Sequence, residues 1–218
     1  MTPVRILIAD DHEVVRQGVR AVLEAVLEAE PEWIVCGEAS SGREAVAMAV
    51  ELRPEVVVLN VSMPELNGLE ATRQIRGAVP AKILILTVHE SDQIATEVLD
   101  AGADGYVLKT DAGRTLIEAI RALLQNQRFF TERVRAVAVR PAGRRRGAAT
   151  RGAVRLTPRQ REVLQLLAEG KSNKEVGATL GVTTKTAETH RTQILAKLKL
   201  HSISELVRYA IRNRIIEP

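Results

Sequence analysis

Five polar side chains stand at or just after the ends of short apolar segments in the first half of the chain: Asp10, Asp11, Asn60, Thr87 and Lys109. Carboxylate oxygens are the ligands that Mg²⁺ prefers, together with water and phosphate oxygens. The Thr87 hydroxyl and the Lys109 ammonium group are donors that suit phosphoryl oxygens. If these side chains meet, they form a magnesium and phosphoryl site in which one member, Asn60, is an amide.

The elements that would position these side chains alternate between strands and helices. Apolar runs predict strands at 4–9, 33–38, 56–60, 83–87 and 105–109. Helical patterns lie between and after them, near 13–29, 41–52, 67–78, 91–101 and 112–126. Strands that are apolar almost throughout are buried on both faces, which predicts an α/β doubly wound, five-stranded parallel sheet. Ligands of such sheets bind beyond the carboxyl ends of the strands, where the five polar residues stand.

The charge of the chain is divided between its two halves. Residues 1–130 contain 12 Lys and Arg against 20 Asp and Glu, a net of −8, whereas residues 131–218 contain 19 against 7, a net of +12. This asymmetry indicates an acidic module joined to a module that meets a polyanion. Cys36 is the single cysteine, and no apolar run at the start is long enough for a signal peptide or a membrane span. We therefore expect a cytoplasmic protein without a membrane partner.

Composition changes again at residue 131. Residues 131–153 hold seven Arg, three Gly and one Pro, which predicts a flexible basic linker between a first domain at 1–130 and a second at 154–218. The second domain reads as a small all-α unit, because the patterns Thr157–Gln160, Ser172–Glu175 and Ser202–Glu205 are typical of capping boxes. A fourth pattern of this kind, Ser41–Glu44, opens a helix in the first domain.

The first domain resembles a response-regulator receiver domain, which has a flavodoxin-like fold. The resemblance covers residues 4 to about 127 and is carried by the acid pair at 10–11, the strand that ends at Asn60, Met63-Pro64 with Gly68, Thr87, and the Lys after GYVL. It implies that the side chain at 60 is the position of phosphoryl acceptance from a histidine kinase. It also implies that Asp10 and Asp11 hold Mg²⁺, that Thr87 and Lys109 sense the phosphoryl group, and that Tyr106 changes rotamer on activation.

The chain departs from that family at the acceptor. An amide is a poor nucleophile beside a carboxylate, so conventional phosphorylation at Asn60 is not expected. The formal charge of the metal site falls from −3 to −2, which should weaken Mg²⁺ binding at Asp10 and Asp11. Two explanations fit the amide: a receiver that works without an acceptor, or an Asp→Asn substitution in an otherwise ordinary regulator.

The second domain has the sequence pattern of a helix-turn-helix. We expect a helix at 172–180, a turn at 181–183 and a second helix from about 184 to 198. One face of this second helix carries a polar stripe: Lys185, Glu188, Thr189, Thr192 and Ala196. The string from LTPRQREVL to ILAKLKL resembles the LuxR/FixJ-type domain of NarL-family response regulators over about 155–215. That resemblance implies phosphate contacts from Lys185 and Thr186 and base contacts from Glu188, Thr189 and Thr192. Further candidate phosphate contacts are Lys171, Lys174, Arg191 and Lys197.

The last helix carries an apolar stripe of Ile203, Leu206, Val207, Ala210 and Ile211. The sequence by itself predicts a core helix, and the resemblance adds a dimer contact, so we expect a homodimer on double-stranded DNA. The leading interpretation is a DNA-binding transcription regulator of the two-component type, in which the receiver masks the helix-turn-helix or limits dimerisation. The alternative is a phosphorylation-independent interaction module with incidental DNA binding. A Mg²⁺-dependent phosphatase is disfavoured, since no nucleophilic carboxylate stands at position 60.

Overall fold

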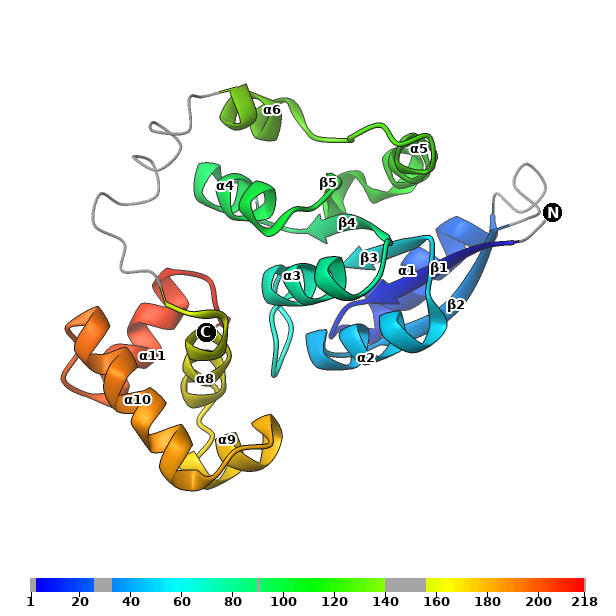
Figure 1. The fold of residues 1–218 in the computed structure, drawn as a ribbon. Helices are drawn as coiled ribbons and strands as arrows, with labels where there is room; N and C mark the ends of the chain where they lie inside the picture. Colours follow the sequence, from blue (N-terminus) through cyan, green and yellow to red (C-terminus); the bar gives the residue numbers. More distant parts are fainter. Residues whose placement is uncertain (1–2, 26–32, 90, 140–155, 218) are drawn as a thin grey trace.

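The structure is a computed structural model that describes residues 3–25, 33–89, 91–139 and 156–217 (Figure 1). Its sheet has the order β2-β1-β3-β4-β5, and every pair is parallel. The strands are β1 (Val4–Ala9), β2 (Trp33–Ala39), β3 (Val56–Leu59), β4 (Lys82–Thr87) and β5 (Gly105–Leu108). The predicted five-stranded parallel sheet is therefore confirmed.

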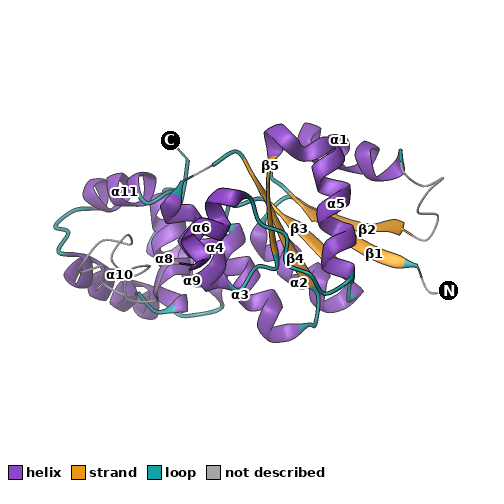
Figure 2. Ribbon diagram, turned by 90° about the horizontal axis from the view of Figure 1, so that it is seen from above, coloured by secondary structure: helices purple, strands orange, loops and turns teal. Residues whose placement is uncertain are grey.

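Helices cover both faces of the sheet, as Figures 1 and 2 show. On one face lie α2 (Gly42–Leu52), α3 (Gly68–Ala78) and α4 (Asp92–Ala101), and on the other lie α1 (Glu13–Glu24) and α5 (Ala112–Leu124). All four residues of β3 are buried, which explains why that strand is built from three valines and a leucine. Burial of aliphatic side chains on both faces of the sheet supplies the main stabilisation of this domain.

A further helix follows α5 inside the segment that we expected to be linker. Residues Glu132–Val139 form α6, and Val134 and Val137 are each only 1% exposed within the core that contains α4. The Arg133 guanidinium lies 3.1 Å from an Asp92 carboxylate oxygen at the start of α4. The expectation of a flexible linker from 131 is thus wrong for this helix, because two valines three residues apart bury one face of it. The rest of the predicted linker, 140–155, lies outside the described residues.

The second domain contains α8 (Pro158–Ala168), α9 (Asn173–Leu180), α10 (Thr184–Leu198) and α11 (Ile203–Arg212) around its own apolar core. Capping boxes at Thr157 and Ser172 are confirmed with both reciprocal hydrogen bonds. At Ser41 and Ser202 only half of the expected box forms. There the glutamate three residues on accepts from the backbone of the residue before the cap, Ser40 or His201.

Within the described part of the chain, no helix is both long enough and apolar enough to cross a membrane.

Candidate functional site

The acidic pocket begins where β1 and β3 end side by side. Ala9 pairs with Leu59, so Asp10 and Asn60 emerge from neighbouring strands at the same edge of the sheet. The Asn60 N–H donates to the Ala9 carbonyl over 2.8 Å. Asp10 is 2% exposed and Asn60 is 5% exposed, so both side chains are held inside the pocket rather than in solvent.

Lys109 supplies the positive charge at this edge. It begins a short 3₁₀ turn, η1 (Lys109–Asp111), directly after β5, and its Nζ lies 2.6 Å from Asp10 Oδ2. The other Asp10 oxygen accepts the His12 N–H over 3.0 Å. A buried carboxylate needs such partners, because an unpaired charge in the interior is strongly destabilising. Two of the sequence-predicted residues, Asp10 and Lys109, are therefore brought into direct contact.

The amide of Asn60 is oriented by two acceptors. Its Nδ2 donates to Asp11 Oδ1 over 3.1 Å and to the Ser62 carbonyl over 2.7 Å. The same Asp11 oxygen lies 3.1 Å from His12 Nδ1. The amide of Asn60 thus places a hydrogen-bond donor, rather than an oxygen ligand, against Asp11.

Gly68 explains the spacing of the motif that follows the acceptor position. A Cβ on Gly68 would lie 1.9 Å from the Asn60 carbonyl oxygen, and the Gly68 N–H donates to the Val61 carbonyl over 2.8 Å. The first residue of α3 therefore has to be glycine for the loop after β3 to fold back onto Asn60.

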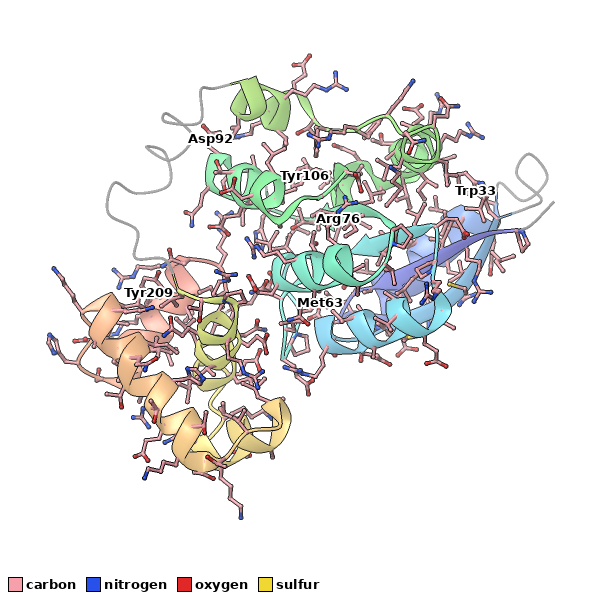
Figure 3. All side chains as sticks on the ribbon, in the orientation of Figure 1. Trp33, Met63, Arg76, Asp92, Tyr106 and Tyr209 are labelled. Carbon is pink, nitrogen blue, oxygen red and sulfur yellow. The ribbon has the colours of Figure 1, made fainter. Side chains whose placement is uncertain are left out.

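Thr87 and Tyr106 are both linked to the backbone of His89. Thr87 is completely buried, and its Oγ1 accepts the His89 N–H over 3.2 Å. The Tyr106 hydroxyl donates to the His89 carbonyl, and Tyr106, labelled in Figure 3, is 1% exposed in the core that also contains residues of α4. The backbone of His89 is consequently held from two sides, with the Tyr106 side chain buried.

The donor set at this edge partly fits Mg²⁺. Among the described residues, one group of three metal-ligating types comes together, Asp10, Asp11 and His12, with one ligand atom each within 4.8 Å. Carboxylate oxygens suit Mg²⁺, whereas an imidazole does not, so Asp10 and Asp11 are the candidates. Asn60 Nδ2 and Lys109 Nζ already bind one oxygen of each acid, and an ion would compete with both.

The helix-turn-helix is built by α9, a tight turn and α10. A Cβ on Gly177 would lie 2.8 Å from the Val182 carbonyl oxygen, and Gly181 has a φ of +66°, so both glycines are needed for the turn. The Thr183 hydroxyl then caps α10 by accepting the Thr186 N–H over 3.1 Å. This geometry holds the two helices at a fixed angle.

The predicted recognition stripe on α10 is exposed. Lys185, Glu188, Thr189, Thr192 and Ala196 all face solvent, while Ala187 and Ile194 are buried in the domain core. The receiver does not cover this stripe in the structure, so of the two expected effects of the receiver, masking of the helix-turn-helix does not occur in this arrangement, and a limit on dimerisation stays a prediction. The hydroxyls of Thr189 and Thr192 donate to the carbonyls four residues earlier, over 2.9 and 3.1 Å, which leaves their methyl groups and oxygen lone pairs for a ligand.

The other residues expected to contact DNA or a second copy of the chain differ in how exposed their side chains are. Lys174 is exposed on α9, and Thr186 and Arg191 are half-buried on α10. In α11, Leu206 and Ala210 are fully buried in their own domain, whereas Ile203 is 36% exposed and Val207 is half-buried. Only Ile203 and Val207 of the four therefore have surface for a second copy of the chain.

Sequence reasoning missed a group of polar residues on α8 and α3 that join the two domains, among them Glu70, Arg161 and Gln165. Glu70 and Gln165 are 2% and 1% exposed, and Arg161 donates to Glu70 across the domain boundary. A polar stripe on a helix is usually a solvated face, so no signal in one sequence distinguishes it from a buried one.

Comparison with protein families gives two matches that divide the chain. The model of the response regulator receiver domain matches residues 6–121. The model of bacterial regulatory proteins of the luxR family matches residues 154–210. Both matches agree with the domains that the structure shows.

Similar whole proteins are known. The transcriptional regulatory protein LiaR of Bacillus subtilis is 41% identical over 214 residues, which is 98% of this chain and 99% of LiaR. The response regulator protein VraR of Staphylococcus aureus is 35% identical over 215 residues, again 98% of this chain and 99% of VraR.

Solved structures give the same picture. RcsB from Salmonella enterica serovar Typhimurium, bound to promoter rprA in the presence of phosphomimetic BeF₃⁻, has a TM-score of 0.61 at 26% identity. That match covers 95% of this chain and 98% of RcsB. A LuxR-family two-component response regulator from Aurantimonas sp. has a TM-score of 0.55 at 36% identity and covers 62% of this chain and 94% of its own.

Proposed function

The chain belongs to the two-component response regulators that carry a LuxR-family DNA-binding domain, and from that premise we propose that it regulates transcription by binding promoter DNA without phosphoryl transfer to residue 60. The observation that carries the proposal is the exposed stripe on α10 in a chain whose acceptor position holds Asn60. The exposed stripe supports DNA reading, and the amide supports independence from phosphorylation.

The chemistry of Asn60 supports the second half of the proposal. An acyl phosphate forms when a carboxylate oxygen attacks phosphorus, and an amide oxygen is a far weaker nucleophile. Asn60 Nδ2 is also bound to Asp11, so the side chain presents a donor where a metal would need an oxygen. Mg²⁺ would be held by Asp10 and Asp11 alone, more weakly than by three carboxylates.

On DNA, we expect some residues of α9 and α10 to contact phosphates and the exposed stripe on α10 to contact base edges. Lys185 and Thr186, at the first turn of the helix, together with Lys174 and Arg191, would hold phosphates and give affinity without sequence information. Glu188 would accept from a cytosine amino group, and the methyl groups of Thr189 and Thr192 would contact thymine methyls. A homodimer joined at Ile203 and Val207 would read two half-sites.

A promoter-binding measurement tests the proposal. Full-length chain should bind a promoter fragment from its own genome more tightly than random DNA of equal length, and log K should fall linearly with log salt. The same chain should take up no phosphoryl group from a small phosphodonor with Mg²⁺, whereas Asn60→Asp should become labelled. Acid-labile phosphorylation of the unmodified chain at residue 60 would contradict the proposal.

The alternative function is a receiver that serves as a constitutive protein-interaction surface. It predicts equal affinity for promoter and random DNA, and it leaves a histidine kinase as a binding partner rather than a phosphodonor. Mapping of bound genomic DNA for the unmodified chain and for Asn60→Asp separates the two, because an incidental binder gives no discrete sites.

A further inference from the structure

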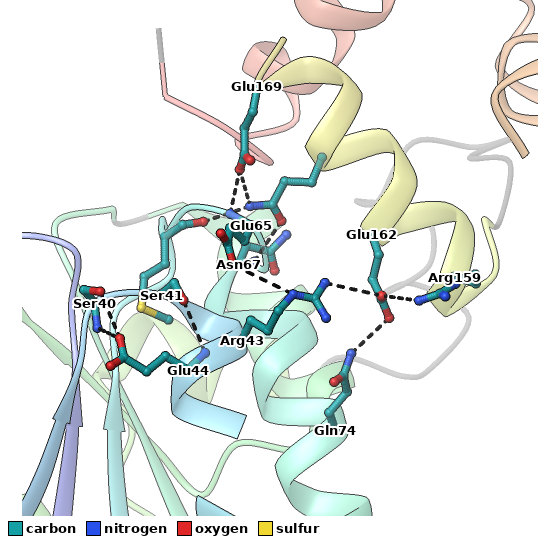
Figure 4. A network of polar contacts seen from close by, with 12 residues as sticks. Ser40, Ser41, Arg43, Glu44, Glu65, Asn67, Gln74, Arg159, Glu162 and Glu169 are labelled. Carbon is teal, nitrogen blue, oxygen red and sulfur yellow. Dashed lines mark hydrogen bonds and ion pairs between the residues drawn. The ribbon is translucent and has the colours of Figure 1, made fainter. Parts of the chain in front are cut away.

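Helix α8 is covered on both of its faces. Glu162 and every residue from Val163 to Ala168 are buried, although α8 belongs to a small domain. One face packs into the core of the helix-turn-helix domain. On the other face, Arg161, Gln165 and the cap residue Glu169 are spaced by about one helical turn and contact α3 and the loop before it. Figure 4 shows Glu169 beside Glu65 of that loop. The two domains are therefore joined through α8.

Side chains of α8 satisfy the backbone of the loop that follows the acceptor position. Gln165 accepts the Asn67 N–H and donates to the Met63 carbonyl, both over 2.8 Å. Glu169 accepts the N–H of Glu65, a residue with a φ of +65°, over 2.9 Å. Three backbone groups within five residues are thus held by the second domain.

Ionic contacts flank this loop. Arg161 of α8 donates twice to the buried Glu70 carboxylate of α3. Glu162 accepts from Gln74 over 3.0 Å, and Arg43 of α2 lies 3.8 Å from its other oxygen (Figure 4). The contacts between the two domains are largely polar, which is typical of interdomain interfaces that permit domain motion rather than of one continuous core.

The segment after α11 reaches the mouth of the acidic pocket. A cavity between the domains is lined by Asp11 and Ser62–Pro64 on one side, and by Ala168, Glu169 and Ile215–Glu217 on the other. Glu217 Oε1 lies 3.6 Å from His89 Nε2, which lies 3.4 Å from Ser62 Oγ. Arg214 Nη1 donates to Ser91 Oγ over 3.3 Å. Residues 214–217 consequently rest on the loops after β3 and β4.

Part of the pocket is left uncovered, although Asp11 also lines the cavity between the domains. The side chains of Asp11 and His12 are 30% and 60% exposed, so water and small ions reach Asp11 along the loop after β1, while Asp10 behind it is 2% exposed. The recognition stripe on α10 is also free of the receiver. Docking therefore covers one side of the pocket while it leaves both the ion path and the DNA-reading face accessible.

We propose that the docked second domain is a size-selective cover on the acidic pocket: small ions enter beside Asp11, while a protein or other bulky group reaches the Ser62–Pro64 side only after α8 and residues 214–217 have moved away. The inference rests on the proposed function, since it describes how access to the same pocket is regulated. It implies that DNA reading needs no undocking.

Accessibility of a thiol at position 62 tests the cover in the full chain. Ser62→Cys in a Cys36→Ser background would be labelled with a small methanethiosulfonate and with a maleimide on a polyethylene glycol of several kilodaltons. The variant Arg161→Ala/Gln165→Ala should raise the rate of the bulky reagent by about tenfold or more, because local opening limits that reaction. The rate of the small reagent should change much less. Arg114→Ala, which removes an exposed arginine from α5, is the matched control and should change neither rate.

A second variant keeps the test valid if changes in α8 impair folding. Arg214→Ala/Glu217→Ala alters two exposed residues of the covering segment and should raise the bulky rate several-fold. Equal bulky rates in the parent and in both variants would overturn the proposal. Promoter binding measured on the same samples keeps the two hypotheses apart: its loss in the parent chain contradicts the proposed function, whereas the ratio of labelling rates reports only on the cover.

Discussion

The side-chain amide of Asn60 donates a hydrogen bond to the Asp11 carboxylate over 3.1 Å, at the bottom of a pocket where Lys109 already neutralises Asp10. The pocket therefore has a donor for each acid without any ion. A carboxylate at position 60 would remove one of these donors and add a third negative charge beside two others, which raises the free energy of the ion-free state.

Asn60→Asp should make stability dependent on magnesium. In EDTA we expect a loss of about 1.5–3 kcal/mol in the free energy of unfolding, because a hydrogen bond to a charged group is lost. Added Mg²⁺ should restore stability to the variant by mass action and change the unmodified chain much less. Thermal unfolding with and without Mg²⁺ measures both effects. Gln127→Glu, an exposed exchange of amide for acid, is the control, and an equal magnesium response in all three proteins would contradict the prediction.

Gly68→Ala should destabilise the receiver, since its Cβ would lie 1.9 Å from the Asn60 carbonyl oxygen and only a backbone shift could relieve the clash. We expect a loss of about 1–3 kcal/mol, the usual cost of such overpacking. Gly77→Ala in the same helix meets nothing within 4 Å and should be neutral or stabilising, by up to about 1 kcal/mol. Urea unfolding of the two variants measures this difference in the free energy of unfolding. Equal changes in both variants would contradict the prediction.

Much of this arrangement could be predicted from the sequence, for identifiable reasons. Runs such as Val56–Leu59 determine buried parallel strands, and strand ends in a parallel sheet meet at one edge, so the contact between Asp10 and Lys109 followed from the pattern. The boxes at Thr157 and Ser172 were equally local signals. Contacts that depend on the relative position of two domains, such as Arg161 with Glu70, have no local signal, because the same residues would suit a solvated surface.

The helix α6 shows a second limit. Its arginines gave the segment a linker-like composition, and the two valines that bury it, Val134 and Val137, were too few to predict a packed helix.

Acidification should tighten docking of the two domains. Burial raises the pKa of Glu169, at the contact between the two domains, and of Glu97, on α4 near Tyr209 and Arg161. A carboxyl whose pKa is raised in the docked state binds its proton more tightly there, so docking is favoured at low pH and weakens as pH rises through the raised pKa. Small-angle scattering should therefore show a smaller radius of gyration at pH 5 than at pH 8. Glu97→Gln/Glu169→Gln should flatten this dependence, and a profile unchanged by the two substitutions would rule these carboxyls out.

Glu188 and Lys185 should affect DNA binding in different ways. Glu188→Ala should reduce discrimination between the correct and a substituted base pair by about 1–3 kcal/mol. Lys185→Ala should weaken binding to all sequences alike and reduce the slope of log K against log salt by about one. Binding titrations on matched and mismatched promoter fragments at several salt concentrations separate the effects. A loss of specificity in Lys185→Ala, or none in Glu188→Ala, would show that the stripe is assigned wrongly.

Because α8 packs both into the core of its own domain and against the receiver, its sequence has to satisfy the contacts of both domains. A helix-turn-helix unit grafted onto this receiver would keep its own fold, but it would hold the backbone at Met63, Glu65 and Asn67 only if it carried a glutamine and a glutamate in the places of Gln165 and Glu169. A chimaera without these two side chains is expected to bind DNA while the loop after Asn60 loses three hydrogen bonds to the second domain.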